Sequence, residues 1–348
     1  MTRKQHTPRS RHGAGFSLIE LLVSLAIGLI IMVAAISAYV GSAGASRMSD
    51  AQSRMNEDAQ AALGILAQQI RMAGNNPDQP NRVGNANPAL SSLRNPVYGT
   101  TSLTLAGTNT TSQLSMRGCD GTFTNINSTN TTTTGIDALT CVAGGTNTVP
   151  DSIAVSYEAD RFNTIPTGGT SSLPTDCLGN KLPVVTATVS TIVAGTASSA
   201  DVTYTVADNR YYIGTASVAN VVTPSLYCKG NGGASVQMPM VENIETLQLR
   251  YGTVSTASTA TTATVAGYLH ATEVLTETSM ALLANDAERW AKVATVRICV
   301  LVRSENPVAP NAASAQYTDC AGNLVDNPPD LRLRRAYTTT VVLRNRRL

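Results

Sequence analysis

The stretch Gly15-Phe16-Ser17-Leu18-Ile19-Glu20 decides how the N-terminal part of the chain folds. It opens an apolar run that ends at Val40, and Glu20 is the only charged residue in that run. Twenty apolar residues at 1.5 Å rise per residue span about 30 Å, the thickness of the hydrocarbon core of a bilayer. The sequence therefore predicts a membrane-spanning helix here.

A short basic segment precedes the apolar run, and its four cations are Arg3, Lys4, Arg9 and Arg11. The next positive charge is Arg47, beyond the run. Because Lys and Arg concentrate on the cytoplasmic side of membrane segments, we expect the basic segment in the cytoplasm and the chain after the span outside it. An ordinary secretory signal peptide has a shorter apolar region, and a carboxylate inside that region would be counterproductive.

Helical periodicity continues beyond the apolar run. Apolar residues recur every three or four positions at Met48, Ala51, Met55, Ala59, Ala62, Leu66 and Ile70. The sequence Gly74-Asn75-Asn76-Pro77 then ends the pattern. We therefore predict one helix from Phe16 to about Ala73, apolar all round in its first half and with one apolar stripe in its second half. Such a stripe needs a partner surface, which the rest of the chain would provide.

From Asn75 onward the pattern changes to short strands, turns and polar loops. The predicted strands are Ser102–Ala106, Ser152–Tyr157, Val184–Val193, Val202–Val206, Val218–Val222, Ala294–Arg303 and Ala336–Leu343. The segments Thr108–Thr134 and Thr253–Thr264 are rich in Thr, Ser and Asn, which predicts exposed loops. Ser279–Ala291 is expected to form a short helix. The predicted fold class is α+β, with a long N-terminal helix packed on a β-rich globular domain.

Composition and charge restrict the classes of function that we expect for this chain. Charged residues make up 14% and aromatic residues 4% of the 348 residues, which suits an exported β-rich domain better than a cytosolic enzyme. The full chain holds 25 Lys and Arg and 23 Asp and Glu. Without the four N-terminal cations the balance is 21 − 23 = −2. Nucleic acid is therefore not an expected partner.

Six cysteines follow the apolar run, at Cys119, Cys141, Cys177, Cys228, Cys299 and Cys320. None forms a Cys-x-x-Cys pair, which argues against zinc ribbons and thioredoxin-type redox motifs. An even number of cysteines in an exported segment favours disulfides, and six cysteines allow 15 full pairings. We favour the pairs that are neighbours in sequence, each worth roughly 3 to 4 kcal/mol if unstrained. Free buried thiols are the alternative.

Enzyme motifs are mostly missing from the sequence. It contains no Walker loop, no Gly-x-Ser-x-Gly and no His-Glu-x-x-His. The histidines are His6, His12 and His270, so a catalytic triad would depend wholly on His270, which we expect to be a solvated loop residue. Asp319, Asp326 and Asp330 form an acidic neighbourhood without the spacing of an EF-hand. We expect no catalytic residues, no cofactor and no metal site.

The pattern from Gly15 to Glu20 resembles the cleavage site of type IV prepilins and pseudopilins. The resemblance implies that a prepilin peptidase in the inner membrane cuts the Gly15–Phe16 bond and methylates the new amine of Phe16. It also implies that Glu20 pairs with the Phe16 amine of a neighbouring subunit during assembly. The alternative is that Glu20 is merely tolerated at the membrane boundary, where a helix N-terminus favours an anion.

Three further segments resemble the PilW minor pilins. They are Val241–Gly252, residues 290–304 and, as the most specific of them, Arg334–Asn345. The resemblance implies a pilin-like fold and a minor pilin that primes type IV pilus assembly with other minor pilins and the major pilin, and that supports a large adhesin at the pilus tip. Twitching, adhesion and DNA uptake stay open. The implied location is the inner membrane, with a periplasmic C-terminal domain, and then the pilus tip on the cell surface.

The implied domain division is a leader at residues 1–15, a transmembrane and assembly half-helix at 16–40, an amphipathic half-helix at 41–74 and a β-rich domain at 75–348. A tip pseudopilin of a type II secretion system is the alternative within the same machinery. An exported binding protein released by signal peptidase after Ala43-Gly44-Ala45 is the alternative from another class.

Two features of the chain leave alternatives open. No proline lies between Phe16 and Asn76, so Gly28 is the only intrinsic weak point of the helix within the apolar run from Phe16 to Val40, or else a position for close helix packing. The C-terminal segment is basic, with Arg332, Arg334, Arg335, Arg344, Arg346 and Arg347. These arginines could protect an edge strand by their charge or form a docking surface for an acidic partner.

Overall fold

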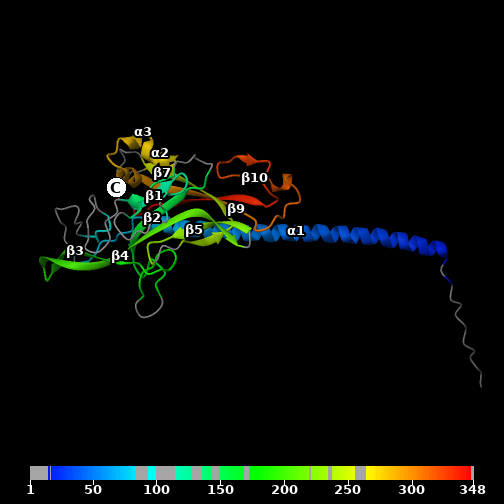
Figure 1. The fold of residues 1–348 in the computed structure, drawn as a ribbon, viewed down its shortest axis with the longest axis horizontal. Helices are drawn as coiled ribbons and strands as arrows, with labels where there is room; N and C mark the ends of the chain where they lie inside the picture. Colours follow the sequence, from blue (N-terminus) through cyan, green and yellow to red (C-terminus); the bar gives the residue numbers. More distant parts are fainter. Residues whose placement is uncertain are drawn as a thin grey trace, which may run out of the picture. The chain divides into compact units, whose positions relative to one another are not determined.

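The computed structural model describes residue 15 and residues 17–80, 82, 93–98, 114–124, 126, 135–142, 149–167, 172–218, 221–233, 237–254 and 264–345. They form a long N-terminal helix and a β-rich domain, which confirms the α+β, pilin-like fold class (Figure 1). The chain divides into two compact units, residues 1–50 and residues 51–348. Helix α1 (Leu18–Met72) contributes to both units. The predicted first helical residue, Phe16, and the predicted strand Ser102–Ala106 lie outside the described residues.

The first unit consists, in its described part, of the apolar half of α1. Its large apolar side chains are more than half exposed from Leu18 to Val40. An 18-residue window of this helix has a mean hydropathy of 2.7, so its length and composition suffice to cross a membrane. An apolar helix exposed all round has its most favourable surroundings in lipid or among similar helices.

The second half of α1 belongs to the second unit and buries one stripe. The stripe consists of Met55, Ala59, Ala62, Leu66, Ala67 and Ile70. These residues recur at three- and four-residue intervals, which places them on one face of the helix. The helix ends at Met72, and Gly74 follows with a φ of +77° and donates its N–H to the carbonyl of Ser156. A Cβ at Gly74 would lie 2.5 Å from the carbonyl oxygen of Asn345, so glycine is required there.

Six of the described strands form one antiparallel sheet. They are β1 (Met116–Cys119), β2 (Ser152–Ala159), β3 (Val184–Val193), β4 (Thr196–Val218), β5 (Val221–Lys229) and β6 (Gln237–Glu242). The order is β1-β2-β4-β5-β6, and β3 pairs with the first half of β4. Figure 1 shows β3 and this part of β4 as a long two-stranded ribbon.

A second antiparallel sheet has the order β12-β9-β7-β8. Its strands are β7 (Ile244–Val254), β8 (Val265–Leu269), β9 (Val293–Arg303) and β12 (Arg334–Val342). The remaining elements are η2 (Gly135–Ala138), α2 (Ala271–Thr276), α3 (Thr278–Ala281), α4 (Asp286–Ala291), η3 (Ala313–Ala315), β10 (Tyr317–Thr318) and β11 (Leu324–Val325).

One hydrophobic cluster joins the α1 stripe to both sheets. It includes Leu66 of α1, Ile153 and Leu226 of the larger sheet, and Leu249 and Ile298 of the smaller one, all of them fully buried. Both sheets therefore bury apolar side chains together with the same helix face. This confirms the prediction that the apolar stripe in the second half of the helix packs on the globular domain.

Three disulfides brace the β-rich domain, and they join the cysteines that are neighbours in sequence. They link Cys119 to Cys141, Cys177 to Cys228 and Cys299 to Cys320. The last of them ties β9 to the segment between β10 and β11. In β9, Val296, Ile298, Val300 and Val302 alternate with residues such as Arg297 and Cys299, a pattern that predicts one buried face. The structure instead buries both faces along the second half of the strand.

Three predictions of local structure are wrong. The predicted strand Val218–Val222 includes the end of β4 and the start of β5, which pair with each other at Val218 and Val221. The predicted loop Thr108–Thr134 contains β1, which is buried, although much of the rest of that segment lies outside the described residues. The predicted helix Ser279–Ala291 is two helices, α3 and α4. Asn285 separates them, because its side chain accepts the N–H of Glu288 and caps the start of α4.

Candidate functional site

The start of α1 holds the carboxylate that the sequence singled out. Glu20 lies in the first turn, and its Oε2 accepts the backbone N–H of Ser17 at 3.0 Å. The N–H groups at the start of a helix have no hydrogen-bond partner within the helix. Glu20 is the third helical residue, and its side chain reaches back to supply one such partner. The sequence Ser17-Leu18-Ile19-Glu20 is the Ser-x-x-Glu pattern of such a cap, a signal that the sequence analysis missed.

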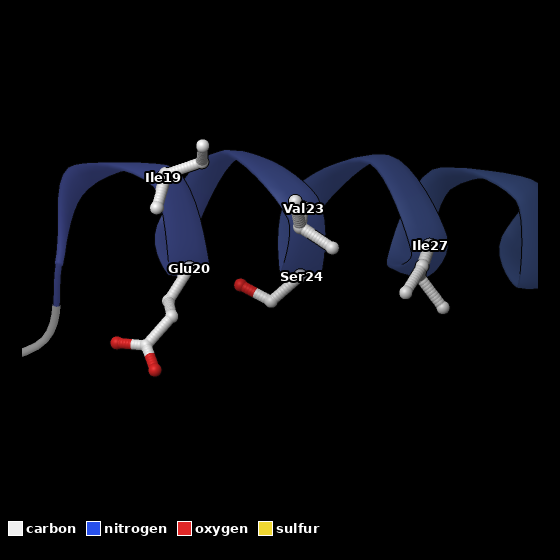
Figure 2. Close-up of a pocket in the computed structure, with 5 residues that line it drawn as sticks. All are labelled: Ile19, Glu20, Val23, Ser24 and Ile27. Atoms are coloured by element: carbon white, nitrogen blue, oxygen red, sulfur yellow. The ribbon is translucent and has the colours of Figure 1, made fainter.

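The surface around Glu20 is a shallow depression along the helix. It is lined by Ile19, Glu20, Val23, Ser24 and Ile27. Figure 2 shows Glu20 and Ser24 one turn apart, with the carboxylate extending away from the helix. The hydroxyl of Ser24 donates to the carbonyl of Leu21 at 3.0 Å. One polar pair therefore lies within a face that is otherwise apolar.

The Glu20 carboxylate has no ion-pair partner among the residues that the structure describes. A carboxylate has about four acceptor positions, and the N–H of Ser17 occupies one of them. The other positions face outward from an exposed apolar helix. The arrangement can therefore accept a cation from another molecule. Gly15 is exposed beside this turn, and Phe16 lies outside the described residues.

Gly28 lies in the apolar half of α1 without a close neighbour. A Cβ placed on it would meet no atom within 4 Å in the described residues. The α-helix continues through this position without a break. Close packing against a second helix and local weakness during assembly both stay predictions for Gly28.

The segments that resemble PilW meet in the smaller sheet. The first forms most of β7, the second ends α4 and forms β9, and the third begins with β12. Strand β9 pairs with β7 on one side and with β12 on the other. Segments that lie far apart in the sequence are thus hydrogen-bonded neighbours.

A cluster of five charged side chains lies at the end of this sheet. It consists of Glu245, Arg303, Asp330, Arg332 and Arg334. The guanidinium of Arg334 donates to both carboxylate oxygens of Glu245, at 2.7 and 3.0 Å, and to Asp330 at 2.7 Å. Arg303 lies 3.6 Å from Glu245, and Arg332 lies 3.4 Å from Asp330. Burial alone would lower the pKa of Arg334, but its hydrogen bonds to Glu245 and Asp330 raise it above the ordinary value.

This cluster corrects the interpretation of the basic C-terminal segment. Strand β12 is an edge strand, as expected, but the Arg334 side chain is 2% exposed and is held by internal carboxylates. It neither protects the edge by a solvated charge nor faces a partner. Arg335 and Arg344 are exposed, and Arg346 and Arg347 lie outside the described residues.

A buried aromatic pair links β7 to the helical insertion between β8 and β9. The rings of Tyr251 and Trp290 meet edge to face with their centroids 4.9 Å apart. The Tyr251 hydroxyl lies so close to Gly118 that a Cβ there would approach it to 1.9 Å. Gly118 is therefore required by the tyrosine, and the pair fixes β1 against β7. Such pairs contribute about 0.5–1.5 kcal/mol beyond their burial.

The prediction of a solvated loop residue at His270 is wrong. Its side chain is 16% exposed, and its Nδ1 lies 3.7 Å from the carboxylate of Asp120. The same carboxylate accepts the N–H groups of Ala271 and Thr272 at the start of α2. The residue that caps α2, Asp120, thus lies directly after β1. Because Asp120 and α2 are far apart in the sequence, no local sequence pattern predicts this contact.

The acidic neighbourhood near the C-terminus serves the fold. The Asp319 carboxylate accepts the N–H groups of Ala321 and Asn323 in a tight turn, and Asp330 belongs to the arginine cluster. Within the described ranges, no three Cys, His, Asp or Glu side chains lie close enough together to hold a metal ion.

Models of two protein families match this chain, one near its N-terminus and one in its C-terminal part. A model of the prokaryotic N-terminal methylation motif matches residues 10–36. Together with a helix able to cross a membrane and a β-rich domain behind it, this match defines a type IV pilin-like protein. The model of the PilW family, described as type IV pilus-assembly protein W, matches residues 210–345.

The two matches directly support a pilin of the PilW type, and together they support a minor pilin of a type IV pilus. The PilW match includes the arginine cluster, the Tyr251–Trp290 pair and β12. Among the described residues, one apolar helix could cross a membrane, and a globular domain follows it in the sequence. This arrangement fits a pilin that is anchored in the inner membrane and later forms part of the pilus. No curated protein and no solved structure matches the chain.

Proposed function

We propose that this minor pilin is cut by prepilin peptidase between Gly15 and Phe16 and helps to prime type IV pilus assembly, in a complex with other minor pilins at the pilus tip. The observation that carries the proposal is the position of Glu20. Its carboxylate is exposed on an apolar helix, and the described residues supply it with one backbone N–H and no cation.

Cleavage gives this carboxylate a partner. Hydrolysis of the Gly15–Phe16 bond frees the amine of Phe16, which stays positively charged after methylation. A carboxylate in a membrane helix costs about 2.5–3.5 kcal/mol at the bilayer centre and less near its boundary. When the α1 helices of two subunits lie side by side, Glu20 of one subunit can neutralise the Phe16 amine of the other. The cost of both charges then falls only if the subunits associate, which favours assembly.

The four parts of the chain would take separate roles. Residues 1–15 form the leader, residues 16–40 the membrane and assembly half of the helix, residues 41–74 the amphipathic half, and residues 75–348 the β-rich domain. The chain acts by association, not by catalysis. Its partners are prepilin peptidase, other minor pilins, the major pilin and a large adhesin at the tip. A β-rich domain of this size is bulky for a subunit repeated along a thin fibre, but one copy fits at its end.

Surface pilin in an in-frame deletion strain tests this function. Pili are sheared from the deletion strain, from the wild type and from the deletion strain with the gene restored, and pilin is quantified. Loss of pili that the restored gene reverses is the expected result. Normal piliation of the deletion strain together with a secretion defect would instead indicate a tip pseudopilin of a type II secretion system.

A further inference from the structure

The sequence Thr-Asp-Cys-x-Gly-Asn occurs twice in the chain, at residues 175–180 and 318–323. The first copy carries Cys177 and the second carries Cys320. Both cysteines form disulfides, and in each case the partner cysteine lies in a strand, β5 for the first and β9 for the second. The repeated sequence therefore accompanies two of the three disulfides.

Both copies fold into the same hairpin turn. The Oδ1 atom of Asp176 accepts the N–H groups of the residues two and four positions later, both at 2.9 Å, and Oδ1 of Asp319 does the same at 2.9 and 2.8 Å. In each turn the aspartate N–H donates to the carbonyl of the asparagine at 3.0 Å. The glycines have φ values of +78° and +90°, which glycine adopts without steric cost. All of these bonds are local, so the sequence of each copy specifies its own turn.

The first turn has a further contact that leads to its disulfide partner. The Oδ2 atom of Asp176 accepts the backbone N–H of Gly232 at 3.0 Å. Gly232 lies four residues after Cys228, to which Cys177 is bonded. One carboxylate therefore holds the turn that carries one cysteine and the loop that follows the other. Within the described residues, Oδ2 of Asp319 accepts only from the asparagine of its own turn.

Glycines allow this loop to approach the turn closely. A Cβ at Gly230 would collide with the carboxylate of Asp176, and a Cβ at Gly232 would lie 2.5 Å from the carbonyl oxygen of Asn180. Asp176 is 6% exposed, and Gly232 is buried. The contact therefore excludes water, and a hydrogen bond to a carboxylate is stronger in such surroundings than in solvent.

A contact of this kind bears on which cysteines pair. Six cysteines allow 15 full pairings. A disulfide forms only when the two Cβ atoms come within about 3.5–4.5 Å of each other, and ordering two chain segments for that purpose costs conformational entropy. A hydrogen bond that already holds both segments lowers this cost. It therefore favours one pairing over the others.

We propose that Asp176 is a positioning residue for the disulfide between Cys177 and Cys228, and that the repeated turn is a local device that selects the partner of its cysteine. Asp176 makes and breaks no covalent bond in this process. The proposal does not depend on the pilin role, since it concerns how the β-rich domain becomes oxidised.

The oxidant in this step is another disulfide. Cys177 is the more exposed of the two cysteines, so its thiolate attacks one sulfur of the oxidant and displaces the other sulfur as a thiolate. The thiolate of Cys228 then attacks Sγ of Cys177 and displaces the second sulfur of the oxidant. The chain loses two electrons and two protons, and the oxidant becomes two thiols. Asp176 favours the second attack because it keeps the two segments together.

The redox equilibrium of each disulfide tests the proposal in the full-length protein held in lipid nanodiscs. The protein is equilibrated in mixtures of reduced and oxidised dithiothreitol, starting from both the oxidised and the reduced protein. Free and bonded cysteines are then labelled with light and heavy alkylating reagents. Mass spectrometry gives the oxidised fraction of each pair, and hence a separate equilibrium constant for each disulfide.

Asp176→Asn separates the two contacts of the carboxylate. An amide has one acceptor oxygen in place of two, so it can hold the turn or the N–H of Gly232, but not both. We expect the equilibrium constant of the Cys177–Cys228 disulfide to fall roughly 10-fold, as for the loss of one hydrogen bond to a charged group. The constant of the Cys119–Cys141 disulfide should stay unchanged.

The second turn supplies the matched controls. In Asp319→Asn the single acceptor oxygen can still hold the turn, so the constant of the Cys299–Cys320 disulfide should change by less than about 2-fold. Asp319→Ala removes the acceptor and should lower that constant roughly 3- to 10-fold. The turn lies at an exposed position, so this variant keeps its fold and still decides the question if Asp176→Asn does not fold.

Three outcomes would overturn the proposal. The first is an unchanged Cys177–Cys228 constant in folded Asp176→Asn. The second is an equal loss of all three disulfides, which would indicate general destabilisation of the domain. The third is an unchanged Cys299–Cys320 constant in Asp319→Ala. None of these measurements involves pilus assembly, so a failure of the proposed pilin role would leave them unaffected.

Discussion

Arg334 and Glu245 lie 89 residues apart in the sequence and form a two-point ion pair, with guanidinium nitrogens 2.7 and 3.0 Å from the two carboxylate oxygens. The pair joins the first residue of β12 to the start of β7, two strands that both pair with β9. It therefore stabilises the end of the smaller sheet at which the edge strand β12 begins.

Arg334→Ala is expected to lower the free energy of unfolding by about 3 kcal/mol. The substitution leaves Glu245 and Asp330 partly buried without their main counter-charge, and breaking such a pair costs more than the pair contributes. Chemical denaturation of the full-length protein in nanodiscs measures the effect. Arg344→Ala, at an exposed position with no ion pair among the described residues, is the matched control and should change the value by less than about 0.5 kcal/mol. Equal effects of the two substitutions would contradict this role for the pair.

Asp151 makes the stability of the domain depend on pH. It is 2% exposed, and burial raises the pKa of its carboxyl to about 7, although the N–H of Leu249 partly offsets the effect. In the unfolded chain an aspartate titrates near pH 3.9. Between these values the unfolded state loses a proton that the folded state keeps. The free energy of unfolding therefore falls as the pH rises from about 4 to about 7, by up to about 4 kcal/mol.

Asp151→Asn isolates this contribution. The amide stays neutral at every pH and can still accept the N–H of Leu249 through its oxygen. We expect the variant to be more stable than the wild type at pH 8 and to lose the extra pH dependence between pH 4 and 7. Denaturation midpoints at four pH values measure it, and Asp50→Asn, at an exposed position of α1, should leave the wild-type dependence intact. Parallel curves for the wild type and Asp151→Asn would refute the prediction.

The elements that the sequence predicts well are those with an uninterrupted pattern. The apolar run and the stripe that includes Ala59 and Leu66 predict α1, which begins at Leu18 and ends at Met72. Alternation predicts β9, and β3 matches its predicted bounds. Strand β7 was missed as a strand because a shift in its pairing between Ile244 and Thr246 breaks the alternation of apolar and polar residues.

The parts of the site that the sequence does not predict depend on contacts over long distances in the chain. Asp120 caps a helix that starts 151 residues later, and Arg334 pairs with Glu245 across 89 residues. Neither of these contacts has a local signature in the sequence. From the sequence alone, Arg334 and His270 are therefore both expected at the surface. The cap of Ser17 by Glu20 is the opposite case, since its four-residue pattern is visible in the sequence.

Removal of a disulfide tests how the three bridges stabilise the domain. Cys299 and Cys320 are 21 residues apart, and Cys177 and Cys228 are 51 apart. If a bridge acts by restricting the unfolded chain, replacing the first pair with alanine should cost roughly 3 kcal/mol and replacing the second about 0.8 kcal/mol more. Denaturation under oxidising conditions compares the two double variants. A larger loss for the Cys299–Cys320 pair would contradict this account.

Glu20→Ala should leave cleavage intact and strongly reduce incorporation into pili, because the Phe16 amine of the neighbouring subunit loses its counter-charge. Glu20→Gln keeps the hydrogen bond to Ser17 and removes only the charge, so it should fail in the same way. Ser24→Ala, one turn further along the same surface, is the matched control and should assemble normally. Sheared pili analysed by immunoblot give the measurement. Normal assembly of Glu20→Gln would show that the charge is not needed.

The N-terminus of the mature protein separates the pilin role from the competing possibilities, because each process leaves a different first residue. Prepilin peptidase would leave methylated Phe16, and the N-terminal methylation motif matched over residues 10–36 makes this the expected species. Release by signal peptidase after Ala45 would leave Ser46 and detach the apolar helix. A protein that stays uncut in the membrane would keep Met1. Phe16 would then have no free amine to pair with Glu20. Mass spectrometry of the purified protein distinguishes the three. A first residue other than Phe16 would remove the basis for pairing between subunits, since the amine would then lie away from the start of α1.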